Sequence, residues 1–259
     1  MAGRALRRDA FKPRQIRIVS QSDDKQTDDV SGAALPAHPS QAASEPDEPI
    51  DPLADVSDPG PDAAAPPLPQ VDELARACVR FVSARYGATL DYHPDTLSFV
   101  DQWVRDARKD IGPGSGAASG KAETVDLAQA AVGAYFGEVV RRRFGGRWVA
   151  EGEHATWRLC LSNVFCAFNP VGMAREALLL GPAEGWGAHL ELDPVDRASI
   201  TARLEALPPA DDDEYYAPTT RFDVLWIVVE ALRASLRARG LGDVHYTIDD
   251  YAPAGSAAR

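Results

Sequence analysis

Apolar side chains recur at helical spacing in three separate stretches in the middle of the chain. The first begins near Val71 and stops at Gly87, a glycine placed as a helix C-cap. Asp95 can cap a second helix, and a third runs from about Glu123 to Phe144, where two glycines follow. The apolar faces comprise Val71, Leu74, Cys78, Phe81 and Val82, then Leu97, Val100, Val104 and Ala107, then Val125, Ala128, Val132, Tyr135, Phe136 and Val139. Each stretch therefore predicts a helix with one face against a core.

Short runs of aromatic and β-branched residues, with turn residues between them, predict strands. In chain order these runs are 88–92, 147–150, 156–161, 164–168, 188–192 and 244–248. The three runs directly after the third helix are close in sequence and predict an antiparallel meander, whereas the last run predicts an edge strand.

Three more helices are expected after the meander. The first covers 171–180, and the second opens at Asp193-Pro194 and must end before Pro208-Pro209. The last is capped by Thr219 or Thr220 and closed by Gly240. Its apolar stripe is Phe222, Leu225, Trp226, Val229, Leu232 and Leu236. Together these elements predict an α+β fold, with a central antiparallel sheet of about three to five strands and helices packed on one face.

The N-terminal part of the chain has too few apolar side chains to form a core. Residues 1–20 are a basic leader, whose segment 4–17 is a candidate for binding a partner. Residues 21–70 form an acidic, Pro-rich linker without an aromatic residue, and they are predicted to be disordered because burial cannot offset the entropy of ordering. This linker either screens the leader or acts as a spacer. A single globular domain is expected over 71–251, with a frayed C-terminus at 252–259.

Charge and composition narrow the class of protein. The formal net charge is −12, which repels phosphate groups and disfavours a nucleic-acid binder. No apolar stretch approaches the length of a membrane span, and the three cysteines form no C-x-x-C pair. We therefore expect a cytoplasmic protein with free thiols. Its preference for arginine over lysine, together with abundant alanine, is typical of a GC-rich bacterial genome.

One stretch resembles a known signature. Gly133-Ala-Tyr-Phe-Gly-Glu-Val-Val-Arg-Arg-Arg-Phe-Gly-Gly-Arg-Trp148 is similar to a segment of small bacterial α+β domains of unknown function. In those domains a helix carrying G-x-x-x-G-E leads through a Gly-Gly turn into a strand with a tryptophan. The resemblance implies an α+β fold and no established activity.

The same stretch supplies the candidate site. Its residues, a candidate interaction or structural motif, are Gly133, Gly137, Glu138, Arg141, Arg142 and Trp148. The two glycines leave a groove that lets another backbone approach, and the glutamate can pair with the arginines three and four residues later. In the alternative interpretation, the glutamate, Arg141 and the tryptophan strand border a concave site for a ligand or partner.

Motifs for cofactors and metals do not occur. The histidines are scattered without H-x-x-x-H or H-E-x-x-H, and no G-x-S-x-G elbow is present. Glu151, Glu153 and His154 gather in one predicted turn, and 211–214 form an acidic loop, but both patterns are typical of solvated turns. We therefore predict no cofactor and no metal site.

A thiol nucleophile is one remaining chemical hypothesis. It would pair Cys160 or Cys166 with His154 or His189 across neighbouring strands. Strand alternation places Cys166 on a core face, so only Cys160, beside Arg158, can face a polar site. Simple burial of both thiols is the favoured interpretation.

Two classes of function stay open at this point. The favoured one is a non-catalytic protein-interaction or regulatory module with a mobile tail, which binds an unidentified protein partner. The alternative is a hydrolase-type enzyme, whose acidic groups, such as Glu138 and Asp223, are brought together only by the fold. A deep pocket with convergent ionisable groups would favour the enzyme, and an exposed apolar patch near 133–148 would favour the binder.

Overall fold

The computed structural model describes residues 61–111 and 120–252. The basic leader, its segment 4–17, most of the predicted linker and nearly all of the predicted C-terminal fray lie outside the described residues. The described part begins with a helix at Pro61, earlier than the domain start that the sequence predicted at Val71. Asp62 is buried in this first helix, so the end of the Pro-rich segment belongs to the folded domain.

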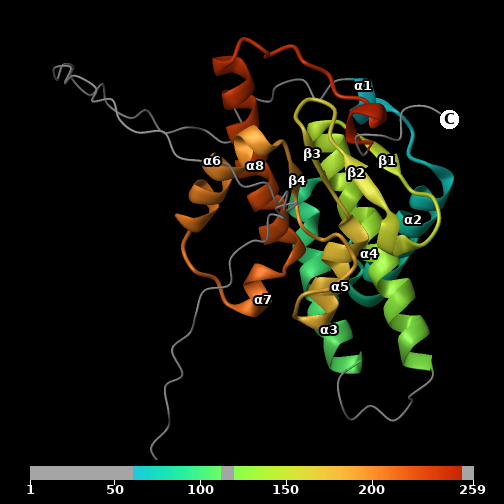
Figure 1. Ribbon diagram of the computed structural model, residues 1–259. Coiled ribbons are helices and arrows are strands. Elements are labelled where there is room, and N and C mark those ends of the chain that lie inside the picture. Colours follow the sequence, from blue (N-terminus) through green and yellow to red (C-terminus); the bar gives the residue numbers. More distant parts are fainter. Residues whose placement is uncertain (1–60, 112–119, 253–259) are drawn as a thin grey trace, which may run out of the picture. The chain divides into compact units, whose positions relative to one another are not determined.

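The described residues form an α+β fold, as predicted (Figure 1). The helices are α1 (Pro61–Ala64), α2 (Pro69–Tyr86), α3 (Leu97–Ile111), α4 (Gly120–Phe144), α5 (Pro170–Leu179), α6 (Pro194–Glu205), α7 (Asp212–Tyr215) and α8 (Pro218–Ala238). Three 3-10 turns are η1 (Pro94–Thr96), η2 (His154–Thr156) and η3 (Ile248–Tyr251). The strands are β1 (Arg147–Val149), β2 (Arg158–Cys160), β3 (Cys166–Phe168) and β4 (Glu191–Leu192). They form one antiparallel sheet in the order β1-β2-β3-β4, which confirms the predicted meander.

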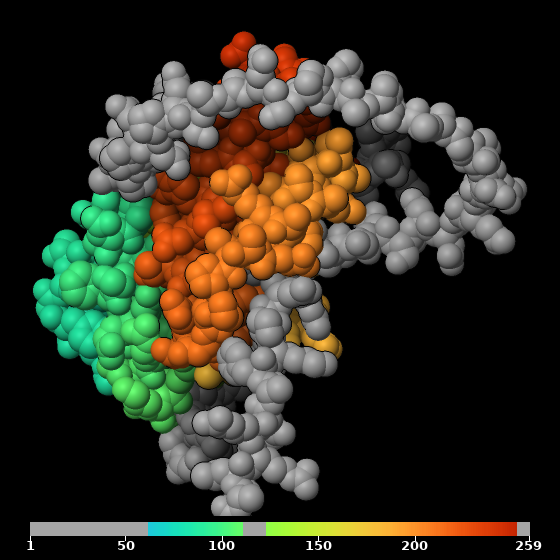
Figure 2. All heavy atoms as spheres, turned by 90° about the vertical axis from the view of Figure 1, so that its left-hand side faces the viewer, coloured from blue at the N-terminus to red at the C-terminus, as the bar shows by residue number. Residues whose placement is uncertain are grey.

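Helix α4 is the centre of the fold. Every residue from Ala128 to Arg141 is buried, so this helix has no solvent-facing side over most of its length. It lies between α2 and α5, with α1, α3 and α8 also in contact (Figure 1). On the other side of the domain, α8 lies between α3 and α6 (Figure 2). A helix enclosed in this way must have small residues where its neighbours cross.

Both faces of the sheet are covered, whereas the sequence predicted helices on one face only. Leu159 and Phe168 pack into the main core with α4. Their neighbours Cys160 and Ala167 point the other way and pack against Tyr251 in η3. The segment after α8 therefore closes the second face with a short aromatic cluster instead of a helix.

Two of the predicted strands are wrong. Residues 88–92 have no ladder partner, and their end is fixed by one hydrogen bond from the Tyr92 N–H to the Tyr135 hydroxyl, 3.1 Å long. Residues 244–248 likewise form no ladder; the N–H of Tyr246 donates to the carbonyl of Ser162, and the segment then turns into η3. Both segments have the composition of a strand, but neither pairs with an edge strand of the sheet.

Two predicted helix caps also differ. Leu97 opens α3 after η1, so Asp95 lies inside the 3-10 turn and does not cap the helix. At α8 the N-cap is Ala217, and the N–H of Thr219 donates to Asp101 of α3 at 3.1 Å. The acceptor comes from another helix, so the local sequence could not indicate it.

Candidate functional site

The predicted motif forms a closed buried network around Glu138. This carboxylate is only 1% exposed, and its Oε1 accepts hydrogen bonds of 2.8 Å from Nε of Arg141 and from the indole Nε1 of Trp148. Its Oε2 accepts from Nη2 of Arg141 at 3.0 Å and lies 3.7 Å from Nε of Arg142, whose side chain is partly exposed. A buried charge of this kind is tolerable because it is both paired and hydrogen-bonded.

Asp62 extends the network to the N-terminal helix. Arg141 donates to the backbone carbonyl of Asp62, and Arg147 and Ser162 donate to its carboxylate. Burial raises the pKa of Asp62, but the hydrogen bonds from Arg147 and Ser162 more than offset this, so the pKa lies below its ordinary value. The imidazole of His245 lies 3.6 Å from the same carboxylate. Because Asp62 separates the serine from the histidine, the imidazole cannot activate that hydroxyl as in a catalytic triad.

The motif glycines are explained by close packing. A Cβ atom at Gly137 would lie closer than 3.0 Å to the indole ring of Trp148. A Cβ atom at Gly133 would lie equally close to the backbone of Val171 at the start of α5. The structure therefore joins the motif residues through packing and buried hydrogen bonds.

The acidic pair suggested for a hydrolase is not assembled. Glu138 is enclosed in the network, whereas Asp223 is exposed on α8. The thiol hypothesis fails as well, because Cys160 is buried against Ala167 instead of facing a polar site. Burial raises the pKa of Cys160 to about 11 and raises that of Cys166 too, so neither thiol is activated as a nucleophile.

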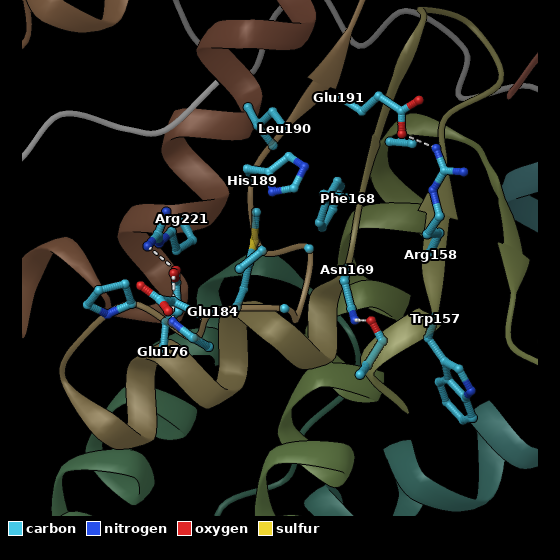
Figure 3. Close-up of a pocket in the computed structure, with 18 of the residues that line it drawn as sticks. Trp157, Arg158, Phe168, Asn169, Glu176, Glu184, His189, Leu190, Glu191 and Arg221 are labelled. Atoms are coloured by element: carbon cyan, nitrogen blue, oxygen red, sulfur yellow. Dashed lines mark hydrogen bonds and ion pairs between the residues drawn. The ribbon is translucent and has the colours of Figure 1, made fainter. Parts of the chain in front are cut away.

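A cavity of about 1020 Å³ lies elsewhere in the domain, away from the predicted motif (Figure 3). Its walls are η2 and the start of β2, the end of β3, part of α5, and most of the segment 182–191. The last wall comprises Tyr215 and Tyr216 at the end of α7 and Arg221, Val224 and Leu225 of α8. Asn169 fixes one corner. Its Oδ1 caps α5 by accepting from Val171 and Gly172, and its amide donates to the carbonyl of His154 at 2.9 Å.

One end of the cavity is built around Arg221. Its Nη2 donates to Oε2 of Glu176 at 2.8 Å, and its guanidinium carbon lies 4.6 Å from the ring centre of Tyr215 and 5.3 Å from that of Tyr216. Arg221 is 7% exposed, and its Nε has no hydrogen-bond partner in the structure. Burial raises the pKa of Tyr215, although the guanidinium opposes this shift.

The other end of the cavity holds a second ion pair, between Arg158 of β2 and Glu191 of β4. His189 lies between the two pairs (Figure 3). Burial lowers the pKa of His189, while the charges of Glu191 and Glu176 oppose that shift in part. The imidazole is therefore neutral near neutral pH.

The sequence interpretation missed this cavity. In the sequence, His189 and Arg158 are candidates only within the thiol-nucleophile hypothesis. Arg221, Glu176 and Tyr215 belong to no recognisable motif. These residues come from β2, α5, the segment before β4 and the α7–α8 region, and the pairing of the strands and the packing of α5 against α8 bring them together. No local signal in the sequence identifies such a site.

No protein-family model, curated protein or solved structure matches the chain. The resemblance of residues 133–148 to small bacterial domains of unknown function therefore stays a prediction. Over 61–111 and 120–252, no three His, Cys, Asp or Glu side chains converge as metal ligands would. Among the helices in those ranges, none has the length and apolar composition needed to cross a bilayer.

Proposed function

We propose that this domain is a non-catalytic module that binds a small molecule in the cavity between the sheet, α5 and α7–α8. The observation that carries the proposal is the cavity itself, whose volume of about 1020 Å³ is at the upper end of the range typical of ligand pockets. Its walls combine apolar side chains such as Phe168 and Met173 with a few converging polar groups, which is the usual composition of such pockets.

The chemistry of the lining residues favours binding over catalysis. Neither cysteine nor serine occurs among the described residues that line the cavity. Glu176 and Glu191 are each held by an arginine, so neither is placed to act as a protonated general acid. The imidazole of His189 and the carboxylate of Glu184 are the general-base candidates among these lining residues, and no activated nucleophile accompanies them. A regulatory role, in which occupancy of the cavity alters contacts with a protein partner, fits these features better than hydrolysis does.

The test is a ligand screen with the full-length protein. Amino acids, dipeptides, sugars, nucleotides and fatty acids are added separately, and the shift in melting temperature is measured by differential scanning fluorimetry. Ligand binding stabilises the folded state by mass action, so a true ligand raises Tm in a concentration-dependent way.

A pair of variants on one helix locates the binding. Val224 lines the cavity, whereas Ile227 is half-buried on the same helix but does not line it. We expect Val224→Trp to abolish the ligand-induced shift and Ile227→Trp to retain it, with both variants folded by circular dichroism. The proposal is wrong if no compound shifts Tm, or if the Val224→Trp protein responds as strongly as the wild type.

A further inference from the structure

We infer that the ligand of the cavity is a zwitterion that carries both an ammonium and a carboxylate group, as in a free amino acid or a short peptide. This inference rests on the proposed function and names the chemical class of the ligand. Two groups at one end of the cavity carry it, the carboxylate of Glu184 and the guanidinium of Arg221.

The charges that line the cavity do not balance. Three carboxylates line it (Glu176, Glu184 and Glu191), against two guanidinium groups (Arg158 and Arg221). The ion pairs Arg221–Glu176 and Arg158–Glu191 use one carboxylate each. Glu184 is left without an ion-pair partner in the described part of the chain, so the cavity carries an excess negative charge that attracts a cation.

Glu184 lies at the same end of the cavity as Glu176 and Arg221 (Figure 3). Its segment contains Gly185 and Gly187, which have φ angles of 78° and 57° and so make a turn that other residues rarely adopt. Glu184 precedes this turn, lines the cavity and is exposed to solvent. An ammonium group near Glu184 and Glu176 would donate hydrogen bonds to the carboxylates of both glutamates.

Arg221 supplies the complementary site for an anion. Its guanidinium is more than nine-tenths buried, lies against Tyr215 and Tyr216, and is hydrogen-bonded to Glu176 through Nη2 and to the side chain of Tyr215. Nε has no acceptor in the structure. An unpaired buried donor is unfavourable, and a carboxylate is the group whose two oxygens match the fork of a guanidinium. A small shift of the guanidinium would let a ligand carboxylate reach this donor.

The rest of the cavity is suited to an apolar side chain. Phe168, Met173, Val224 and Leu225 supply apolar wall to the same cavity, whose other end holds the ion pair Arg158–Glu191. Apolar wall beside the charged groups of Glu184 and Arg221 fits an α-amino acid with an apolar side chain. The volume also accommodates a dipeptide, which carries the same two charged ends further apart.

The experiment is isothermal titration of the full-length protein with the common L-α-amino acids and with apolar dipeptides. The tightest ligand is then compared with its N-acetyl derivative, which lacks the ammonium, and with its methyl ester, which lacks the carboxylate. We expect each derivative to bind at least about tenfold more weakly, because each loses a charge-assisted hydrogen bond. Whether the amino acid or the dipeptide binds more tightly identifies the source of the zwitterion.

A matched pair of variants tests the role of Glu184. This residue is exposed, so Glu184→Gln should fold normally, and we expect it to weaken binding by about tenfold. The control is Glu123→Gln, an exposed glutamate on α4 that does not line the cavity, which should bind like the wild type.

The outcomes separate this inference from the proposed function. If only sugars, nucleotides or fatty acids bind, and Val224→Trp abolishes that binding, the zwitterion is wrong and the proposed function stands. If the capped derivatives bind as tightly as the parent, or Glu184→Gln changes nothing, the zwitterion is also wrong. If no compound binds at all, both proposals fail.

Discussion

The indole Nε1 of Trp148 donates a 2.8 Å hydrogen bond to the carboxylate of Glu138, and this bond joins the first strand of the sheet to the central helix inside the core. The same carboxylate holds Arg141, whose guanidinium reaches back to the N-terminal helix α1. One buried acidic group therefore links the consecutive elements α4 and β1 and, through Arg141, the helix α1, which is distant from both in sequence.

Trp148→Phe tests this bond. The phenyl ring retains most of the packing but removes one donor from a buried carboxylate, so we expect the free energy of unfolding to fall by about 1–3 kcal/mol. Urea denaturation measures the change. The control is Trp103→Phe, which alters a half-buried tryptophan stacked on Phe81 and should cost less than about 1 kcal/mol. Equal losses in the two variants would show that the indole bond contributes little.

Gly137→Ala tests the close approach of α4 and β1. A methyl group at this position would overlap the ring of Trp148, so overpacking of about 1–3 kcal/mol should exceed the roughly 1 kcal/mol that alanine gains in a helix. The expected result is a lower Tm. Gly181→Ala is the control, because the nearest atom to its Cβ would be 3.9 Å away. A Gly137→Ala protein as stable as the wild type would contradict this account of the motif.

Tyr251→Phe tests the closure of the second face of the sheet. The Tyr251 hydroxyl accepts from the N–H of Cys166 at 3.0 Å and donates to a carbonyl of the β2–β3 hairpin, 2.7 Å away at Leu161. Without it these buried backbone groups lose their partner, and we expect a loss of about 1–3 kcal/mol in urea denaturation. The matched variant Tyr246→Phe removes a less buried hydroxyl from the same cluster and should change stability by less. A larger loss of unfolding free energy in Tyr246→Phe than in Tyr251→Phe would contradict the role given to the Tyr251 hydroxyl.

His189 predicts a specific pH dependence. Burial lowers its pKa in the folded state, so the folded protein binds this proton less readily than the unfolded chain does. Its contribution to stability is therefore complete above the ordinary imidazole pKa of about 6.5 and is lost as the pH falls towards the lower, folded-state value. We expect His189→Gln to lose less unfolding free energy than the wild type between about pH 7 and pH 5.

The pH test has an internal check. Burial also lowers the pKa of His154, so the double variant His154→Gln/His189→Gln should show a flatter dependence than either single variant. Urea denaturation at each pH supplies the curves. Parallel curves for the wild type and the variants would contradict the sign of both shifts.

Apolar periodicity and helix-ending glycines predicted the positions of the main helices well, although α4 is buried on all sides from Ala128 to Arg141 and not on one face only. The third helix was expected from about Glu123 to Phe144 and spans Gly120–Phe144, and the three-stranded meander was placed correctly. The errors have a different physical origin. Residues 88–92 and 244–248 resemble strands in composition, but strand formation needs a partner edge, which is a property of the whole fold. Asp62 looked like part of a linker because its partners, Arg147 and Ser162, lie far along the chain.

The candidate site was less predictable than the fold. The sequence singled out Gly137, Glu138 and Trp148 because they are close together in the chain, and they proved to be buried packing residues. The residues of the cavity are close only in space. Arg221 and Glu176 are on different helices and become neighbours through tertiary packing, for which a single sequence has no local signature.

The enclosure of α4 has a consequence for how the protein is made. Part of its cover, α2, precedes it in the chain, but α5 and α8 follow it. During synthesis on a ribosome, part of the apolar surface of α4 stays uncovered until α5 and α8 have been translated. The core can be completed only after α8 has emerged, so a protein truncated before α8 should expose apolar surface and aggregate instead of folding as a smaller stable domain.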